Sequence, residues 1–369
     1  MGLRTLARGL ATLAALAAPA TLAAQTLRIA TYDPGLSREG PGLLLRDIRR
    51  GDPQVLAAAA VIAHNRPDAI VLTGVDWDHD GRALGAFAAV LAQAGLDLPH
   101  RFTARPNAGM ASGIDLDGDG RAGTADDSQG FGLFAGQGGM AVLSRLPITG
   151  ILDHSATLWR DVPGQLMPPD TPPAAAAVQR LSTTNHWDVT LRTPAGPLHL
   201  LAWAAAPPVF DGPEDRNGRR NHDEAAFWLD HLPDAPFVLL GNANLDLADG
   251  EGRPEAMHDL LARAQDPRPR GAWQPTQDGA NLRHRGDPAL DTAQYPAADG
   301  PGNLRLDYVL PARGLRVIAS GVDWPAPDDP RAVTVQTASN HHLVWVDLAP
   351  AGETPQPVAA VPTPPTANR

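Results

Sequence analysis

One segment of the sequence has the residue types and spacing of a calcium-binding loop. In the twelve residues that begin at Asp115, carboxylates stand at positions one, three, five and twelve, as Asp115, Asp117, Asp119 and Asp126. Glycine at position six permits the sharp turn on which such loops depend. The last ligand is usually a glutamate, and Asp127 is a second candidate for that place. We therefore expect calcium as a cofactor that orders this loop; the alternative is a solvated acidic turn.

Composition excludes several other kinds of chemistry. The 369 residues include no cysteine, which excludes disulfides, thiolate zinc sites, iron–sulfur clusters and cysteine nucleophiles. They also include no lysine, which excludes Schiff-base and P-loop lysine chemistry. With 41 acidic and 30 basic side chains, the formal net charge is −11. Coating of nucleic acid is therefore not expected, because phosphate affinity requires a basic surface.

Both ends of the chain differ in composition from its middle. Residues 1–24 combine Arg4 and Arg8 with a short apolar run and small residues, which is the pattern of a secretory signal peptide. That run is too short to span a bilayer, and no other stretch approaches the necessary length. Residues 349–369 are rich in proline, threonine and alanine, which predicts a disordered tail. We expect one folded domain over residues 25–348, in a protein exported to the periplasm or the medium.

Short apolar runs alternate with helical stretches along this domain. Several of the runs are apolar at consecutive positions, so both faces of the sheets should be covered by other elements. The pattern predicts an α/β (α+β) layered fold, and the long connections at 99–138 and 203–221 are candidates for function. Helices are expected at 54–65, 82–94, 222–232 and 254–264. Strands are expected at 26–32, 69–75, 139–144, 187–192, 198–203, 237–240, 304–310, 315–321 and 343–348.

Polar residues follow several of the expected strands, in six segments of the chain. These are LRIATYDPGL (27–36), PDAIVLTGVDWD (67–78), GQGGMAVLSRLPI (136–148), FVLLGNANLD (237–246), RLDYVL (305–310) and SNHHLVWVDL (339–348). In this order they resemble the endonuclease/exonuclease/phosphatase superfamily of metal-dependent phosphoesterases. Residues 207–221 further resemble a secreted bacterial branch of it. The resemblance implies a two-sheet sandwich flanked by helices.

The resemblance also implies a catalytic set, most of which this chain has replaced. In the family an Asn follows the first strand and a metal-binding Glu the second; a His, an Asp-x-Asn pair and a terminal Asp-His complete the set. The positions that correspond here are Asp33, Gly74, Trp203, Asn242, Asn244, Asn340 and His341. The family set supplies three carboxylates, and Asp33 alone supplies one here, so magnesium would lose most of its attraction. The amides at 242 and 340 cannot act as general bases.

Three functional hypotheses follow from the substituted set. The first is a pseudoenzyme that binds a ligand in the former catalytic cleft, the ligand being phosphorylated or otherwise anionic. The second is an active phosphoesterase with a shifted metal site, in which Asp76 or Asp78 joins Asp33; against it, both residues could simply border a turn. The third is a calcium-stabilised interaction module. Asp307 is expected to pair with His341 or with an arginine, and the sequence leaves the partner unidentified.

The charged segment from Phe210 to Asp223 has two interpretations. Its acids and His222 could hold a second cation while its arginines meet a phosphate. Alternatively, these charges pair among themselves on a turn that leads into the following helix. We favour the second for any single residue of the segment.

Overall fold

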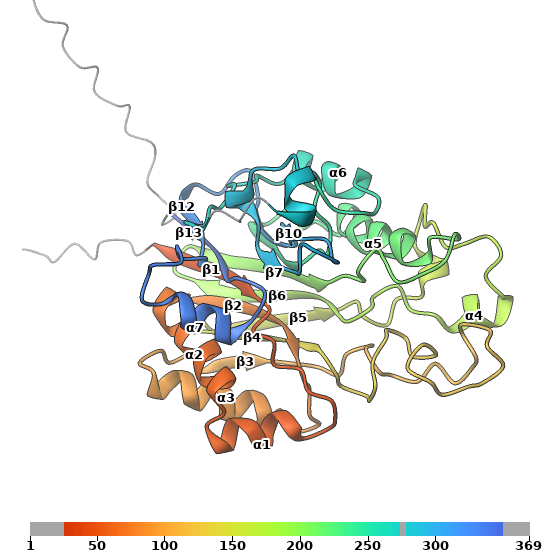
Figure 1. The fold of residues 1–369 in the computed structure, drawn as a ribbon, viewed down its shortest axis with the longest axis horizontal. Coiled ribbons are helices and arrows are strands. Elements are labelled where there is room, and N and C mark those ends of the chain that lie inside the picture. The colour runs from red at the N-terminus through yellow and green to blue at the C-terminus, as the bar shows by residue number, and fades with distance from the viewer. Residues whose placement is uncertain (1–25, 274–277, 350–369) are drawn as a thin grey trace, which may run out of the picture.

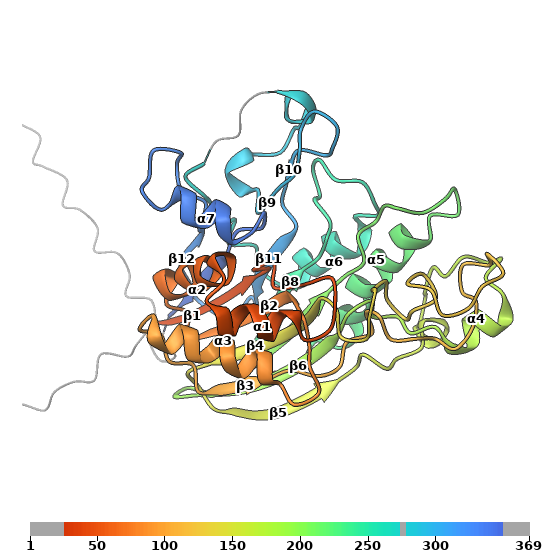
Figure 2. The ribbon, with the colours of Figure 1, turned by 60° about the horizontal axis from the view of Figure 1, so that its bottom comes forward.

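The computed structural model describes residues 26–273 and 278–349, which form two stacked β-sheets with helices on both outer faces (Figures 1 and 2). This is the two-sheet sandwich flanked by helices that the sequence predicts, so the fold class is confirmed. The expected signal peptide at 1–24 lies outside the described residues, as does the expected tail at 349–369 apart from its first residue. No helix within the described ranges is long and apolar enough to cross a membrane.

The first sheet has six strands in the order β12-β13-β1-β2-β4-β3. Strands β1 and β2 are parallel, and the other neighbouring pairs are antiparallel. A parallel pair aligns the carboxyl ends of its two strands, so the residues that end β1 and β2 meet at one edge of the sheet. The strands are β1 (Leu27–Tyr32), β2 (Ala69–Val75), β3 (His100–Phe102), β4 (Gly139–Ser144), β12 (Val317–Val322) and β13 (Val344–Leu348).

The second sheet has five strands in the order β11-β8-β7-β6-β5. Here β7 and β8 are the parallel neighbours, and β11 pairs with β8 in the antiparallel sense. The strands are β5 (Ile148–Asp153), β6 (His186–Thr193), β7 (Gly196–Ala204), β8 (Phe237–Asn242) and β11 (Asp307–Pro311). A separate two-stranded sheet pairs β9 (Ala293–Gln294) with β10 (Asn303–Leu304).

Helices cover the outer face of each sheet, and a third apolar layer fills the space between the sheets. The first sheet is covered by α1 (Leu43–Arg50), α2 (Pro53–Asn65), α3 (Arg82–Gln93) and α7 (Ala332–Ala338). The second is covered by α5 (Arg216–Ala226), η2 (Phe227–Asp230) and α6 (Glu255–Arg263). Helix α2 shows how the sequence sets such boundaries, because the carboxylate of Asp52 caps its first turn by accepting from the N–H of Gln54 at 3.0 Å.

Two long irregular segments, 103–138 and 154–185, lie side by side and form an arm at the right of Figure 1. The arm contains η1 (Trp159–Asp161) and α4 (Pro173–Val178), and Asn107 joins its two halves by donating to the carbonyl oxygens of Ser155 and Ser182 at 2.7 Å each. The remaining short helices are η3 (Gly279–Arg283) and η4 (Pro288–Leu290).

Several elements differ from the expectation. Strands β2 and β4 have the predicted bounds, but the predicted strand 304–310 is divided between β10 and β11. The predicted helix 222–232 begins earlier, at Arg216, so the long connection that precedes it is shorter than expected. The start of α5 lacks apolar periodicity because its buried face carries Arg220, Asn221, Asp223 and Glu224. An analysis based on apolar spacing cannot detect such a helix.

Candidate functional site

Three residues on neighbouring strands of the second sheet form a row at its edge. Ala204 of β7 is in register with Asn242 of β8, and Asn242 is in register with Asp307 of β11. Residues in register on neighbouring strands point to the same face, here the face toward the first sheet. The residue of β7 that lies beside Asn242 is therefore Ala204.

The position of Trp203 corrects an expectation from the sequence. Its place in the family set, at the histidine, implies a side chain that faces the cleft, but Trp203 is 0% exposed and packs in the apolar layer beneath α5 and α6. The reason is the alternation of side chains along a strand, which directs Trp203 and Ala204 to opposite faces of the sheet. A methyl group, and not an indole, therefore stands at the cleft side of β7.

Asp33 and Gly74 meet where β1 and β2 end. Gly74 has a left-handed backbone with φ of 60°, and a Cβ atom placed on it would lie 2.3 Å from Oδ1 of Asp33. That carboxylate oxygen also accepts a hydrogen bond from the N–H of Gly35 at 2.9 Å. The Asp33 carboxylate thus fills the space that a side chain at position 74 would require.

His341 is held between an acid and a phenol. Its Nδ1 lies 2.8 Å from Oδ2 of Asp307, and its Nε2 lies 3.2 Å from the hydroxyl of Tyr295. The pairing of Asp307 with His341 is one of the two that the sequence left open. Burial lowers the pKa of His341, but the Asp307 carboxylate more than offsets this and raises the pKa to about 9. At neutral pH the imidazolium therefore donates from both ring nitrogens, to Asp307 and to Tyr295.

The three asparagines of the site have structural partners or face solvent. Oδ1 of Asn242 accepts from the N–H of Asn244 at 2.8 Å, and Nδ2 of Asn244 donates to the carbonyl oxygen of Ala205 at 2.7 Å. Both amides thereby stabilise the turn after β8, where Asn244 has a positive φ of 49°. Asn340 is exposed, and its backbone carbonyl accepts from the N–H of Gln294 at 2.8 Å.

The two aspartates that could have supplied a shifted metal site are engaged elsewhere. Asp76 accepts hydrogen bonds from the hydroxyl of Ser37 and from the N–H groups of Arg38 and Gly138, at 2.8–3.0 Å. Asp78 accepts from the first backbone N–H groups of α3 and so caps that helix. Neither carboxylate is directed at Asp33 by these contacts.

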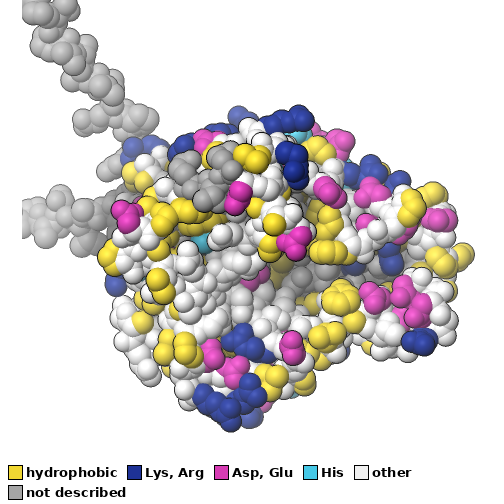
Figure 3. All heavy atoms as spheres, viewed as in Figure 1, with side chains coloured by type: hydrophobic (Ala, Val, Ile, Leu, Met, Phe, Trp, Pro, Cys, Tyr) yellow, Lys and Arg dark blue, Asp and Glu magenta, His cyan; other side chains and the backbone are white. Residues whose placement is uncertain are grey.

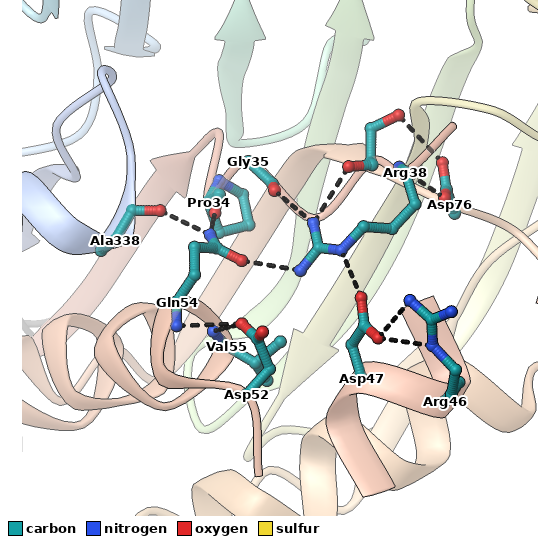
Figure 4. A network of polar contacts seen from close by, with 11 residues as sticks. Pro34, Gly35, Arg38, Arg46, Asp47, Asp52, Gln54, Val55, Asp76 and Ala338 are labelled. Atoms are coloured by element: carbon teal, nitrogen blue, oxygen red, sulfur yellow. Dashed lines mark hydrogen bonds and ion pairs between the residues drawn. The ribbon is translucent and has the colours of Figure 1, made fainter. Parts of the chain in front are cut away.

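Figure 4 shows the network around Arg38 that fixes the segment after β1. Arg38 donates to Asp47 of α1 and to Gln54 of α2, each at 2.9 Å, while its own N–H is bound by Asp76. Gln54 in turn donates to the carbonyl oxygens of Pro34 and Ala338, at 2.7 and 2.6 Å. The edge of the first sheet that carries Asp33 is therefore held by side chains of the helices beneath it.

The calcium-type loop converges on a set of aspartates that differs partly from the expected one. Carboxylate oxygens of Asp115, Asp117 and Asp127 all lie within 4.8 Å of one another, whereas Asp119 and Asp126 are not part of the group. Asp127 is buried, and its oxygens accept from the N–H groups of Leu116 and Thr124 at 2.7 and 2.9 Å. Within the described residues this is the one group of three such side chains close enough to share a metal ion. The positions that correspond to the family's catalytic set form no such group within the described residues.

A cavity of about 730 Å³ opens beside the former catalytic positions, on the hollowed face seen in Figure 3. Asn244 and Tyr295 line one part of it, and the basic residues Arg283, His284 and Arg285 line another. Of the acids that also line the cavity, Asp249 accepts from the N–H groups of Arg285 and Gly286, at 2.6 and 2.9 Å. Neither arginine side chain makes an ion pair in the described part of the chain. Nη1 of Arg283 donates to the carbonyl oxygen of Gly279 at 3.5 Å, and Asp246 and Glu251 also line the cavity.

The sequence reasoning did not identify Tyr295, Thr292 or the basic run at 283–285. Thr292 donates its hydroxyl to Asp307 at 2.9 Å and so helps to orient the acid that holds His341. These residues lie in a stretch of short elements without a motif or a regular apolar period. Only the fold brings them to the ends of β8 and β13.

A two-sheet sandwich with polar residues at the ends of β1, β2, β8 and β13 defines the phosphoesterase architecture that the resemblance implied. The model of the endonuclease/exonuclease/phosphatase family matches residues 38–341, and the chain belongs to this family.

Solved structures agree with that assignment at the level of the fold. An endonuclease/exonuclease/phosphatase from Beutenbergia cavernae is 20% identical with a TM-score of 0.52, the match covering 89% of this chain and 72% of that one. A family protein from Leptotrichia buccalis is 14% identical with a TM-score of 0.51, the match covering 88% and 99%. The comparison with curated proteins finds no match.

Proposed function

We propose that this protein is an exported pseudoenzyme of the family, which binds an anionic, phosphorylated ligand beside the former catalytic positions without hydrolysing it. The observation that carries the proposal is the Asp33 carboxylate 2.3 Å from where a Cβ on Gly74 would lie. A glutamate at position 74 would have to displace Asp33. It would also have to adopt a left-handed backbone, a conformation that is unfavourable for residues other than glycine. The residue that holds the metal in the family therefore has no equivalent here.

The residues present do not fit a magnesium ion. Magnesium requires several oxygen ligands in near-octahedral geometry, usually with one or two carboxylates. Asp33 is the one carboxylate left in the family set, and one of its oxygens already accepts from Gly35. Asp76 and Asp78 are engaged by backbone N–H groups. We derive no step through a metal at this place.

The site also lacks a side chain that is free to act as a general base. Asn242 stands where the family has an aspartate, and a carboxamide cannot take up a proton from water at neutral pH. Both ring nitrogens of His341 are bound by neighbours, Asp307 and Tyr295. The side chains that remain can bind and orient an anion, and Arg283, Arg285 and His284 supply the charge and the hydrogen-bond donors for this.

Calcium in the loop at Asp115 is part of the same proposal. Two independent features support it, namely the spacing of the aspartates in the sequence and the approach of Asp115, Asp117 and Asp127 to within 4.8 Å. Bound there, calcium would order the arm and take no part in chemistry. Calcium concentrations outside the cell are high enough for a weak calcium site to be filled.

Hydrolysis assays test the absence of activity. We expect purified protein with magnesium, manganese or calcium to turn over neither bis(p-nitrophenyl) phosphate nor p-nitrophenyl phosphate above a no-enzyme blank. Metal-dependent turnover that disappears in Asp33→Ala would refute the pseudoenzyme and favour an active enzyme with a shifted metal site.

Calorimetric titration with inorganic phosphate tests anion binding. We expect the double variant Arg283→Ala/Arg285→Ala to weaken phosphate binding at least tenfold, because it removes both guanidinium groups from the cavity wall. Arg49→Ala/Arg50→Ala is the matched control, since both are exposed arginines in the last turn of α1 and neither lines the cavity. Equal affinity of all three proteins would refute the assignment of the cavity to an anion.

A further inference from the structure

A second cavity, of about 760 Å³, lies between the arm and the start of α5. Its wall is formed by parts of three stretches of the chain, 116–131, 168–183 and 206–220. None of the former catalytic positions lines it, although it shares Pro207 and Phe210 with the cavity that we assign to an anion.

Five carboxylates line this second cavity, and none of them is paired with a cation. In the described part of the chain, no arginine or histidine lies within ion-pair distance of them. Some accept single backbone hydrogen bonds, such as Asp211 from the N–H of Asn217 at 2.5 Å and Glu214 from that of Gly212 at 3.1 Å. Those contacts fix the carboxylates, and the nearby charge of Arg216 offsets only part of the charge of Asp117, Asp211 and Glu214. The five are Asp117, Asp126, Asp170, Asp211 and Glu214.

Two arginines also line the cavity but leave it negative overall. Arg220 is buried, and its guanidinium donates to the carbonyl oxygens of the arm, Leu181 and Gln129 among them, at 2.8 and 2.5 Å. Arg216 donates to Oε1 of Gln179 at 2.6 Å. With five carboxylates against these two guanidinium groups, the wall carries a net negative charge. A concave wall of one sign concentrates its field on an approaching ligand of the other sign.

The carboxylates are spread around the cavity and do not converge on one point. Of the five, only Asp117 belongs to the group of acids that could share a metal ion. A single metal ion therefore cannot satisfy them together. A ligand with several positive charges spaced along a flexible chain can reach several of them in turn.

Apolar groups between the carboxylates suit the carbon chain of such a ligand. Phe210 is 90% exposed and Phe131 is 64% exposed, and both line the cavity with Pro168 and Pro172. Phe210 also has a left-handed backbone with φ of 69°, a costly conformation that tends to occur at binding sites. Aromatic faces attract ammonium groups and pack against methylene chains. Figure 3 shows apolar and acidic side chains gathered at the right of the hollowed face, where the arm lies.

We propose that this cavity binds a linear aliphatic polyamine. The charge of the wall selects a cation, the separation of the carboxylates selects one with several amino groups, and the phenylalanines and prolines accommodate the methylene segments. A volume of about 760 Å³ is of the size that small-molecule sites have. The site shares Pro207 and Phe210 with the first cavity and Asp117 with the calcium-type loop, but the proposal requires neither an anion nor calcium to be bound.

Calorimetric titration of the whole folded protein with spermidine, in 50 mM salt with EDTA, tests the proposal. We expect 1:1 binding that weakens as salt is added, and a loss of at least tenfold in affinity in Asp211→Asn/Glu214→Gln. Phe210→Ala should weaken binding severalfold without a change of charge. The control is Asp234→Asn/Asp259→Asn, which removes the same charge from two exposed positions that do not line the cavity. This control should bind spermidine as the unchanged protein does.

Several outcomes would overturn the proposal. They are no binding of spermidine, equal weakening in the control, and binding of trilysine at least tenfold tighter than of spermidine, which would indicate a basic peptide. If Asp211→Asn/Glu214→Gln does not fold, Asp170→Asn replaces it, because Asp170 makes no side-chain hydrogen bond within the described residues. Full displacement of spermidine by calcium, together with unchanged spermidine affinity in the cavity variants, would assign the binding to the calcium-type loop instead.

Discussion

At the scale of single residues, the pair formed by Asp33 and Gly74 decides how the former catalytic centre is to be understood. The two residues lie 41 positions apart in the sequence, yet the parallel pairing of β1 with β2 places them together. The carboxylate has moved, in effect, from the second strand to the first, where it closes the space above the glycine. On the pseudoenzyme that we propose, the exchange leaves a negative charge at the edge of the sheet without the geometry that a metal ion requires.

The contact between the two residues predicts that a methyl group at position 74 lowers the free energy of unfolding by more than one at another left-handed glycine. Gly74→Ala should lower the free energy of unfolding by about 2–4 kcal/mol, because a left-handed alanine costs about 1–2 kcal/mol and the Cβ also collides with Asp33. Gly81→Ala is the matched control, with φ of 62° and no atom closer than 3.7 Å to the added Cβ. Urea unfolding should show the excess in Gly74→Ala and its loss in Asp33→Ala/Gly74→Ala. Equal costs at 74 and 81 would contradict the contact.

His341 predicts a dependence of stability on pH. Its pKa of about 9 in the folded protein lies above the ordinary value near 6.5, so the folded state binds this proton more tightly. The stability that results is complete below pH 6.5 and is lost as the pH rises toward 9. At about 1.4 kcal/mol per pKa unit, the loss is at most about 3.5 kcal/mol. Urea unfolding at pH 6 to 9.5 measures it, and NMR of the ring should show titration near pH 9.

Two buried acids also make stability depend on pH in this range, so the contribution of His341 is measured by comparing the unchanged protein with a variant. Burial raises the pKa of Glu224 to about 7 and that of Asp291 to about 8, so both also make the folded state less stable as the pH rises through these values. Asp307→Asn removes the carboxylate that raises the pKa of His341 and leaves the two acids in place. The decline from pH 6.5 to 9 should therefore be smaller in Asp307→Asn than in the unchanged protein. Parallel curves would show that His341 does not contribute.

At the scale of elements, α5 joins the arm to the second sheet through a buried polar face. Glu224 accepts from the N–H groups of Thr183 and Ala206 at 2.5 and 2.6 Å. Asp223 accepts from the indole N–H of Trp159 at 2.6 Å. The charged segment that leads into this helix is thus largely a structural connection to the arm. Apart from the contact of His222 with Asp223, its charges do not pair among themselves within the described residues, so this part of the interpretation that we favoured from the sequence is wrong. Its arginines and acids bind the protein's own backbone and leave few groups for a phosphate.

Arg220 should be essential to this connection. Arg220→Met leaves several carbonyl oxygens of the arm without donors and leaves the buried Glu224 without its neighbouring cation, for an expected loss of about 3–5 kcal/mol. Arg219→Met is the control on the same helix; its side chain is half-buried and donates to the carbonyl oxygens of Glu214 and Leu166. That variant should lose about 1 kcal/mol or less. Urea unfolding and hydrogen exchange at 180–183 measure both, and equal losses would contradict the assignment.

At the scale of the whole molecule, the acidic excess of the chain is unevenly distributed. Carboxylates gather in the calcium-type loop and around the second cavity. Asp33 and Asp307 stand where the strands of the two sheets meet the site, and three further acids, Asp246, Asp249 and Glu251, line the first cavity. The basic run at 283–285 lines the first cavity together with Asn244 and Tyr295. One face of the protein thus offers separate places to an anion and to cations. The shared wall at Pro207 and Phe210 separates the two cavities.

Calcium should stabilise the whole protein if it binds the aspartate loop. A ligand at one hundred times its dissociation constant adds about 2.7 kcal/mol to the free energy of unfolding, which corresponds to a rise of several degrees in Tm. We expect millimolar calcium to raise Tm above the value in EDTA, and Asp117→Asn to abolish the rise. Asp119→Asn is the matched control, because Asp119 lies outside the converging group. An identical Tm in calcium and in EDTA would exclude the site.

The sequence by itself determined the layered fold, the family and most strands. Apolar runs such as the one in β2 are readable because burial on both faces requires apolar side chains at consecutive positions. It also placed Asp33, Gly74 and Asn242 at or just after the ends of strands and His341 shortly before one. The extents of β10, β11 and α5 were not readable, since their boundaries depend on polar contacts that apolar spacing does not record.

Only the tertiary structure decided what each side chain at the site does. Strand register directs Ala204 to the cleft and Trp203 away from it, and parallel pairing places the carboxylate of Asp33 against Gly74. Tyr295 reaches His341 from a short strand that carries no motif. The physical reason is that local sequence sets the period of an element, whereas the direction of a side chain and its neighbours follow from how distant elements pack.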